Sequence, residues 1–155
     1  MFVDTAKGSG LILLHENEKG IYGDNAARCL DVLESIGSED LKAVFDPANF
    51  VQCKQETFPE AYNMLKPYIE YMHIKDALED GNVVPAGMGI GKVKEILADL
   101  KSSNYEGFLS LEPHLSNFVG LASLEEGKEK EAISTNTQDK FRLATKHLRD
   151  ILAQI

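Results

Sequence analysis

Several features that would assign this chain to a particular class of protein are scarce or missing. It has no tryptophan, and its two cysteines, Cys29 and Cys53, are not spaced as metal ligands or as a redox pair, so we expect unpaired thiols. The longest apolar run is Leu11–Leu14, far short of the roughly 20 residues that span a bilayer. Residues 1–10 lack the basic start and apolar middle of a secretory signal. A cytoplasmic protein that does not enter a membrane is therefore expected.

Positively charged residues are also few. The chain has 16 lysines and arginines against 25 aspartates and glutamates, for a net charge of −9. Because nucleic-acid affinity depends largely on lysine and arginine at phosphates, we expect no nucleic-acid partner. A small ligand bridged by a cation suits an acidic protein better. With 155 residues, 43% of them hydrophobic, the chain has enough apolar material for one domain over residues 1–155.

Four short segments with the composition of buried strands each end in a side chain that binds metals. Those end residues recur at intervals of roughly 30 residues, which suits a repeated unit of strand, helix and return loop. Parallel strands present their carboxyl ends at one rim, so the four side chains are expected to form one site. The predicted strands span residues 11–16, 43–46, 68–74 and 107–112, and the end residues are Glu16, Asp46, His73 and Glu112.

Helical patterns fill the intervals between these strands. An apolar face with the helical period follows Asp24 and ends at Gly37, and Thr57 with Glu60 forms a capping-box pattern that opens a second helix. The second strand is expected to lead into a loop at residues 46–49. Further amphipathic helices are predicted at residues 93–100 and 141–152, the last one after a long surface loop at residues 116–138.

The alternation of strands and helices predicts an α/β fold with parallel strands and right-handed crossovers. A complete (β/α)8 barrel takes about 250 residues, so this chain has room for four βα units, half of a TIM barrel. Residues 1–10 resemble the tail of a preceding helix. The alternative is a small open doubly wound sheet, which also binds ligands beyond the carboxyl ends of its strands. A half barrel has exposed sheet edges, so self-association is expected.

The proposed ligand set has a defined chemistry. Three carboxylates and one imidazole suit Mn²⁺, Mg²⁺ or Co²⁺, admit Zn²⁺, and leave coordination positions open for substrate. Each residue alone has a simpler explanation, since Asp46 could cap a helix or form a turn with Pro47, and His73 could be a core histidine. The occurrence of all four in phase favours a divalent-metal site.

Three further residues are candidate substrate contacts. Lys75 shares the strand parity of His73 and is predicted to face the same site, although a solvated lysine is the alternative. Asn49 is a weaker candidate, and Asp76 either contacts substrate, supports a ligand or is a turn residue. The glycines of Gly87–Gly91 are too weak a signal for a phosphate-binding loop, so a flexible barrel loop is predicted there.

Four motifs carry a family resemblance. They are HENE at His15–Glu18, DPAN at Asp46–Asn49, HIKD at His73–Asp76 and LEP at Leu111–Pro113, and they resemble the xylose isomerase-like TIM-barrel superfamily. This superfamily includes sugar-phosphate isomerases and epimerases, ketose 3-epimerases, inosose dehydratases and apurinic endonucleases. The similarity runs from Leu11 to Glu112 and corresponds to strands five to eight of the barrel.

The resemblance implies that the parent enzyme is a metal-dependent sugar or sugar-phosphate isomerase or epimerase that works by enediolate proton transfer, and that this chain is a truncated half of it. The residues matching Glu16, Asp46, His73 and Glu112 bind the metal in the epimerase branch, and the two glutamates also move protons. That double role is chemically sound, because moving a hydrogen beside a carbonyl requires a base, an acid and an electrophile for the enediolate charge. Carboxylates on both faces of the reacting carbon permit inversion.

The chain departs from its relatives at two places. Asn49 stands where apurinic endonucleases and most ketose 3-epimerases carry a histidine, and the loop Asn82–Gly91 lacks the Asp and His ligands of the endonucleases. A trinuclear zinc site is therefore not expected. The alternatives to an epimerase are an inosose dehydratase-like lyase, an apurinic-endonuclease-like hydrolase and a non-catalytic half-barrel fragment.

Overall fold

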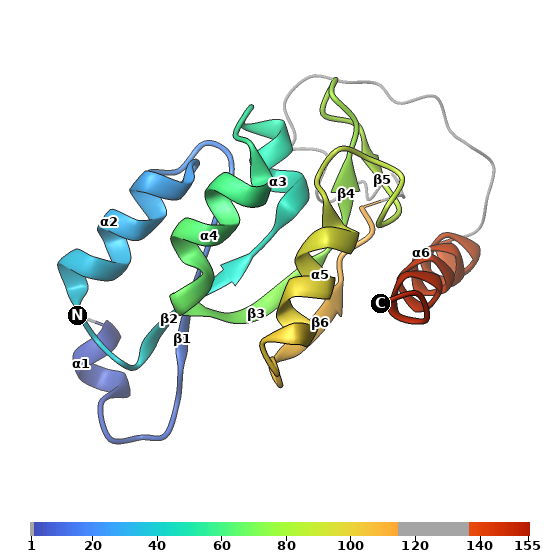
Figure 1. Cartoon of the computed structure of the whole chain (residues 1–155). Coiled ribbons are helices and arrows are strands. Elements are labelled where there is room, and N and C mark those ends of the chain that lie inside the picture. Colours follow the sequence, from blue (N-terminus) through green and yellow to red (C-terminus); the bar gives the residue numbers. More distant parts are fainter. Residues whose placement is uncertain (1, 115–136) are drawn as a thin grey trace.

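The computed structural model describes residues 2–114 and 137–155 and has the α/β architecture predicted from the sequence (Figure 1). Strands and helices alternate along most of the described chain, with a kinked segment at Thr57–Ala61, in which Phe58 is extended, and a 3-10 turn at Lys66–Tyr68. The helices are α1 (Phe2–Ala6), α2 (Ala26–Ile36), α3 (Pro47–Gln52), α4 (Tyr62–Leu65), α5 (Val93–Ser102) and α6 (Thr137–Leu152). The strands are β1 (Leu13–Glu16), β2 (Leu41–Phe45), β3 (Ile69–Ile74), β4 (Asp76–Ala77), β5 (Val83–Val84) and β6 (Phe108–Leu111).

The main sheet has the strand order β1-β2-β3-β6, and all of its neighbouring strands pair in parallel. Its register shifts between Ala43 and Val44, after which Phe45 pairs with Met72. The residues that follow, Asp46 and His73, therefore lie level on neighbouring strands. Beyond β3, the short strands β4 and β5 form an antiparallel hairpin that carries the next loop.

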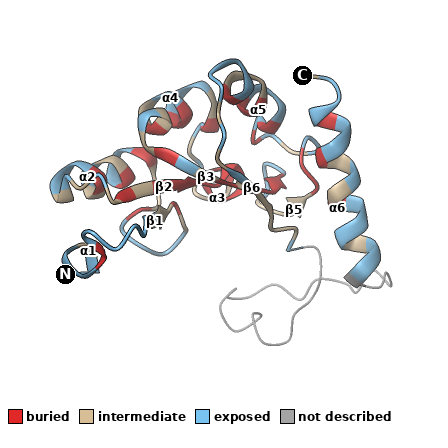
Figure 2. Ribbon diagram, turned by 90° about the horizontal axis from the view of Figure 1, so that it is seen from below, coloured by how far each residue is buried: buried red, intermediate tan, exposed pale blue. Residues whose placement is uncertain are grey.

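The helices α2, α4 and α5 lie together on one side of this sheet, which arches beneath them (Figure 2). Phe45, Met72 and Ile74 pack against this helix layer and are fully buried. Each such side chain contributes roughly 1.5–3 kcal/mol through the removal of apolar surface from water. Because side chains alternate along a strand, Tyr71 and His73 project to the opposite face.

All four predicted strands of the main sheet are present, with ends that move by up to two residues. The helix predicted after Asp24 is α2, but its cap is Asn25, whose side chain accepts a hydrogen bond from the Arg28 amide. Gly37 ends α2 as predicted, in the left-handed conformation with φ 61°. The chain before β1 contains the short helix α1, in agreement with the helical tail predicted there.

Two local predictions are wrong. Residues 46–49 are not a loop, because Asp46 caps the helix α3 and Pro47 occupies its first turn. The capping box at Thr57 does not form: the Thr57 hydroxyl donates to the Gly91 carbonyl at 2.9 Å, and Phe58 keeps extended dihedrals. A tertiary hydrogen bond to a distant loop has displaced the local one.

The last helix, α6, starts earlier than predicted. It includes Gln138, which the sequence placed in the surface loop, while residues 116–136 of that loop lie outside the described residues. Ala144, Leu148 and Ile151 are buried as predicted for its apolar face, whereas Phe141 is about half exposed. None of the helices in residues 2–114 and 137–155 has the length and apolar content that crossing a bilayer requires.

Candidate metal centre

The carboxyl ends of the four parallel strands bring the four predicted ligands together. Glu16 ends β1, Asp46 follows β2, His73 lies near the end of β3, and Glu112 follows β6. One donor atom from each residue lies within 4.8 Å of all the others. The strands thus gather three carboxylates and an imidazole from residues far apart in the sequence.

His73 forms the centre of the cluster. Its Nδ1 lies 2.8 Å from Glu16 Oε1, 3.2 Å from Glu112 Oε2 and 3.8 Å from Asp46 Oδ2. The hydrogen bonds with Glu112 and Glu16 raise the pKa of His73 to about 10, against the opposing effect of burial. The site therefore has a strong negative potential that favours a positive charge at this position.

Lys75 lies in the same cluster, and its side chain is only 3% exposed. Its Nζ is 2.7 Å from Glu112 Oε2 and 3.1 Å from Asp46 Oδ2. Burial lowers the pKa of Lys75, but the charge of Asp46 and the hydrogen bond to Glu112 outweigh that effect and raise it overall. Lys75 is therefore a buried ammonium shared by two of the candidate ligands.

Asp46 caps α3, as the sequence allowed, and also lies in the cluster of candidate metal ligands. Its Oδ1 accepts the Asn49 amide at 3.0 Å and caps α3, while its Oδ2 is buried without a hydrogen bond and lies 3.1 Å from Lys75 Nζ and 3.8 Å from His73 Nδ1. Burial raises the pKa of Asp46, and Lys75 opposes this. A buried carboxylate oxygen without a hydrogen bond, beside two other acids, fits a divalent cation.

Glu112 is the most heavily contacted of the glutamates. Burial raises its pKa, but hydrogen bonds with His114, His73 and Lys75 hold the pKa of Glu112 well below its usual range. His114 Nε2 lies 3.0 Å from Glu112 Oε1, on the side away from Lys75. Glu112 is therefore ionised and positioned through both of its oxygens.

Sequence reasoning missed Asn17, the residue directly after Glu16. Asn17 is buried and binds the backbone of Asp46 twice: its Nδ2 donates to the Asp46 carbonyl at 2.9 Å, and its Oδ1 accepts the Asp46 amide at 2.8 Å. Asn49 continues this network, because its Nδ2 donates to the Asn17 carbonyl at 2.9 Å and lies 3.3 Å from Glu16 Oε1. The pairing locks two ligand-bearing strand ends together.

We expect Asn17→Ala to lower the free energy of unfolding by about 1–3 kcal/mol, because it leaves the buried amide and carbonyl of Asp46 without partners. Thermal or urea unfolding measures this loss. Asn63→Ala is the matched control, since Asn63 is exposed on α4 and its replacement should change stability by less than about 0.5 kcal/mol. Equal losses in the two variants would contradict the role given to Asn17.

Comparison with known proteins assigns the fold. The model of the xylose isomerase-like TIM barrel family matches residues 2–144. The chain belongs to this family. No curated protein sequence matches it closely enough to count as a relative.

Solved structures share the fold of this family member at low sequence identity. An L-ribulose 3-epimerase has a TM-score of 0.76 at 19% identity, and the match covers 98% of this chain and 50% of the epimerase chain. A D-psicose 3-epimerase has a TM-score of 0.74 at 20% identity and covers 96% of this chain and 50% of its own. The probable 3-DHS dehydratase of petrobactin synthesis from Bacillus anthracis has a TM-score of 0.61 at 21% identity, covering 72% of this chain and 46% of its own. The chain spans about half the length of the solved structures it matches.

Four other residues of this xylose isomerase-like chain, Asp76, His15, Cys29 and Cys53, lie outside the cluster of candidate ligands. Both carboxylate oxygens of Asp76 accept backbone N–H groups, which favours its supporting role over substrate contact. His15 faces away from the centre, with its Nε2 buried where a side chain on Gly23 would clash at 2.3 Å. Cys29 and Cys53 are free thiols as predicted, and burial raises the pKa of Cys29 to about 12.

Proposed function

We propose that this protein takes part in metal-dependent isomerisation or epimerisation of a sugar by proton transfer through an enediolate. The observation that carries the proposal is the placement of two glutamates. Glu16 and Glu112 come from β1 and β6, the two edge strands of the sheet, and both reach His73 Nδ1. Two carboxylates approaching one point from opposite sides suit removal of a proton on one face of a carbon and its return on the other.

Glu16, Asp46, His73 and Glu112 would hold the divalent cation, for which Mn²⁺, Mg²⁺ and Co²⁺ suit the mostly oxygen donor set and Zn²⁺ is an alternative. When bound, the cation supplies positive charge that stabilises the enediolate oxygens. In this proposal, Glu16 and Glu112 carry out the proton transfers: one removes a proton from the substrate carbon and the other returns it. Lys75, already ionised beside Glu112, would donate a hydrogen bond to a substrate oxygen, and Asn49 would orient Glu16.

The test is exchange of the C3 hydrogen of D-psicose in D₂O, followed by NMR with Mn²⁺ present, because a D-psicose 3-epimerase shares this fold. We expect Mn²⁺-dependent deuterium incorporation, abolished by Glu16→Gln and by Glu112→Gln. Glu34→Gln, at an exposed position on α2, is the control and should keep full exchange. Product analysis separates the alternatives, since a dehydratase would release water instead of an epimer. Unchanged exchange in both site variants would contradict the acid and base roles.

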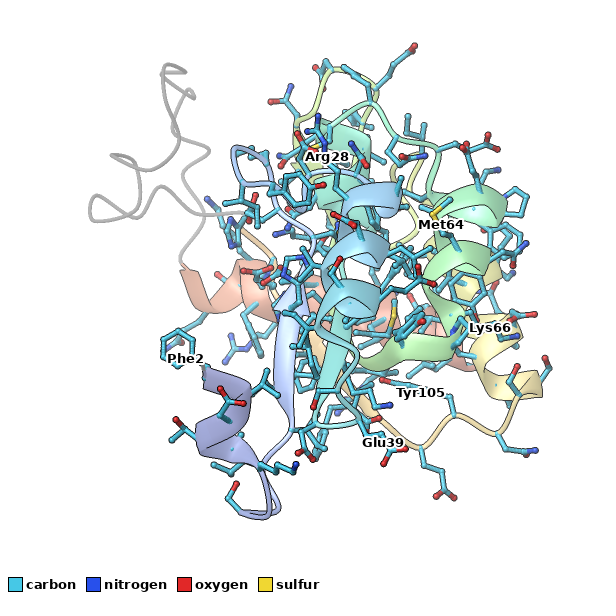
Figure 3. All side chains as sticks on the ribbon, turned by 90° about the vertical axis from the view of Figure 1, so that its left-hand side faces the viewer. Phe2, Arg28, Glu39, Met64, Lys66 and Tyr105 are labelled. Atoms are coloured by element: carbon cyan, nitrogen blue, oxygen red, sulfur yellow. The ribbon has the colours of Figure 1, made fainter. Side chains whose placement is uncertain are left out.

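We also propose that the protein self-associates through the edges of its sheet. Several large apolar side chains are exposed at the two ends of the arch. Phe108 on β6 is 74% exposed and Phe2 on α1 is 88% exposed, where Figure 3 shows its ring pointing away from the body of the protein. Leu14 on the edge strand β1 and Phe141 on α6 are also exposed, at 41% and 51%. The open edges of β1 and β6, beside apolar side chains, favour pairing with strands of a second copy of the chain.

Light scattering on a size-exclusion column should therefore give a mass above the 17.1 kDa of one chain. Phe108→Asp should shift the mass toward that of a monomer, because it places a charge on the edge strand. Ile21→Asp, at an exposed apolar residue of the loop after β1, is the control and should not. A stable monomer at high concentration would rule out self-association.

A further inference from the structure

Asp76, the last residue of the HIKD motif, is fully buried and bound by four backbone amides. Its Oδ1 accepts the N–H groups of Ala77 and Gly91, each at 2.8 Å. Its Oδ2 accepts the N–H groups of Gly87 and Gly89, each at 3.0 Å. The carboxylate thus serves as an internal anion, around which the loop Gly87–Gly91 is wrapped.

The loop fits around Asp76 because it carries glycine where the backbone approaches most closely. A Cβ at Gly89 would lie 2.4 Å from Asp76 Oδ1 and 2.3 Å from the Ala77 carbonyl oxygen, and a Cβ at Gly91 would lie 2.7 Å from Asp76 Oδ1. Gly87 has φ +81°, a conformation that other residues rarely adopt. Three glycines and one aspartate therefore form one interdependent unit.

This arrangement decides what the glycine loop does. Backbone N–H groups of one loop that converge on one point form an anion-binding concavity, here called the anion nest, as in phosphate-binding loops. Here the converging amides of Gly87, Gly89 and Gly91 already donate to Asp76. They are unavailable to a phosphate group of a substrate.

The same unit braces the metal centre. Asp76 follows Lys75 directly, so fixing the Asp76 side chain fixes the backbone next to the buried ammonium, between β3 and β4. The backbone of Gly91 approaches Pro47, the residue after Asp46, closely enough that a Cβ would lie 3.1 Å from Pro47 Cβ. The Gly91 carbonyl also accepts the Thr57 hydroxyl. The loop therefore contacts the chain beside both Lys75 and Asp46.

We propose that Asp76 is a positioning residue that fills the anion nest of the Gly87–Gly91 loop and thereby holds Lys75 and Asp46 in place for the metal centre. This inference rests on the proposed function, which supplies the metal. It also narrows the class of substrate, because the amides of the Gly87–Gly91 loop do not bind the phosphate of a sugar phosphate. Asp76 acts through the loop and does not touch substrate.

The test compares Asp76→Asn with Asp80→Asn, an exposed aspartate of the same hairpin that binds Asn82. Asp76→Asn preserves volume but replaces one acceptor oxygen with a donor. We expect hydrogen exchange at the Gly87, Gly89 and Gly91 amides to accelerate at least about 10-fold, and the Mn²⁺ affinity to fall by about 10-fold or more, as for other partners of metal ligands. Asp80→Asn should change neither.

Two results would overturn the proposal: wild-type exchange rates and wild-type Mn²⁺ affinity in Asp76→Asn, or phosphate-induced shifts of the three glycine amide resonances in the wild-type protein. The phosphate titration uses the wild-type chain, so it is informative even where the variant fails to fold. The exchange experiment needs no metal. Failure of the wild-type protein to bind Mn²⁺ would therefore count against the proposed function, while slow exchange at the three glycines would still support the anchoring by Asp76.

Discussion

Asp46→Asn is expected to weaken Mn²⁺ binding by more than about 100-fold while leaving the protein folded. The loss should exceed the 10- to 100-fold effect typical of residues that only support a ligand, because Oδ2 of Asp46 is itself a proposed ligand atom. The fold should persist because asparagine caps a helix as well as aspartate does, so the bond to the Asn49 amide can be retained. Isothermal titration with Mn²⁺ measures the affinity.

Asp31→Asn provides the control for this substitution. Asp31 is exposed on α2 and does not belong to the ligand cluster, so the same chemical change there should leave the Mn²⁺ affinity unaltered. Equal weakening in both variants would indicate that Mn²⁺ responds to the overall negative charge. Unchanged affinity in Asp46→Asn would remove Asp46 from the ligand set.

Lys75→Met should lower the free energy of unfolding of the metal-free protein by about 3–5 kcal/mol, the range for removing one partner of a buried ion pair. Lys75 is the buried cation between Asp46 and Glu112, and without it the two carboxylates repel each other. Added Mn²⁺ should restore much of this stability, because it supplies positive charge to the same oxygens. Urea unfolding with and without Mn²⁺ measures both effects.

Lys66→Met is the matched control. Lys66, in the 3-10 turn after α4, pairs with Asp99 on α5, but both side chains are 37% exposed, and such surface pairs contribute about 0–1 kcal/mol. Its replacement should therefore cost little, and Mn²⁺ should not alter that cost. A loss at Lys75 no larger than that at Lys66, or one that Mn²⁺ leaves unchanged, would contradict the electrostatic role of Lys75.

The strands and the ligand cluster were accessible from the sequence because their signals are local or repeated. Short apolar runs that end in a polar residue mark a parallel strand and its carboxyl end without knowledge of distant contacts. The apolar period of α2 and the glycine that ends it are likewise encoded within one helix. Once the strands are parallel and adjacent, Glu16, Asp46, His73 and Glu112 must meet at one rim.

The parts that were missed depend on contacts between segments far apart in the chain. Thr57 is followed by a capping pattern, yet its hydroxyl binds Gly91, 34 residues away, and the local cap is lost. Asn17 was overlooked because its importance lies in matching the backbone of Asp46, which only the β1–β2 pairing reveals. The sequence leaves Asp76 as a substrate contact, a support for a ligand or a turn residue, because its four amide donors include three from a loop 11 to 15 residues away. In each case a tertiary partner outweighs the local pattern.

The most direct test of the proposed metal centre is diffraction from crystals soaked in Mn²⁺, measured at a wavelength at which manganese scatters anomalously. We predict one strong anomalous peak within ligand distance of Glu16, Asp46, His73 and Glu112. An absence of any peak at the strand ends at saturating Mn²⁺, or a peak bound elsewhere on the acidic surface, would contradict the claim that these four residues form a metal centre.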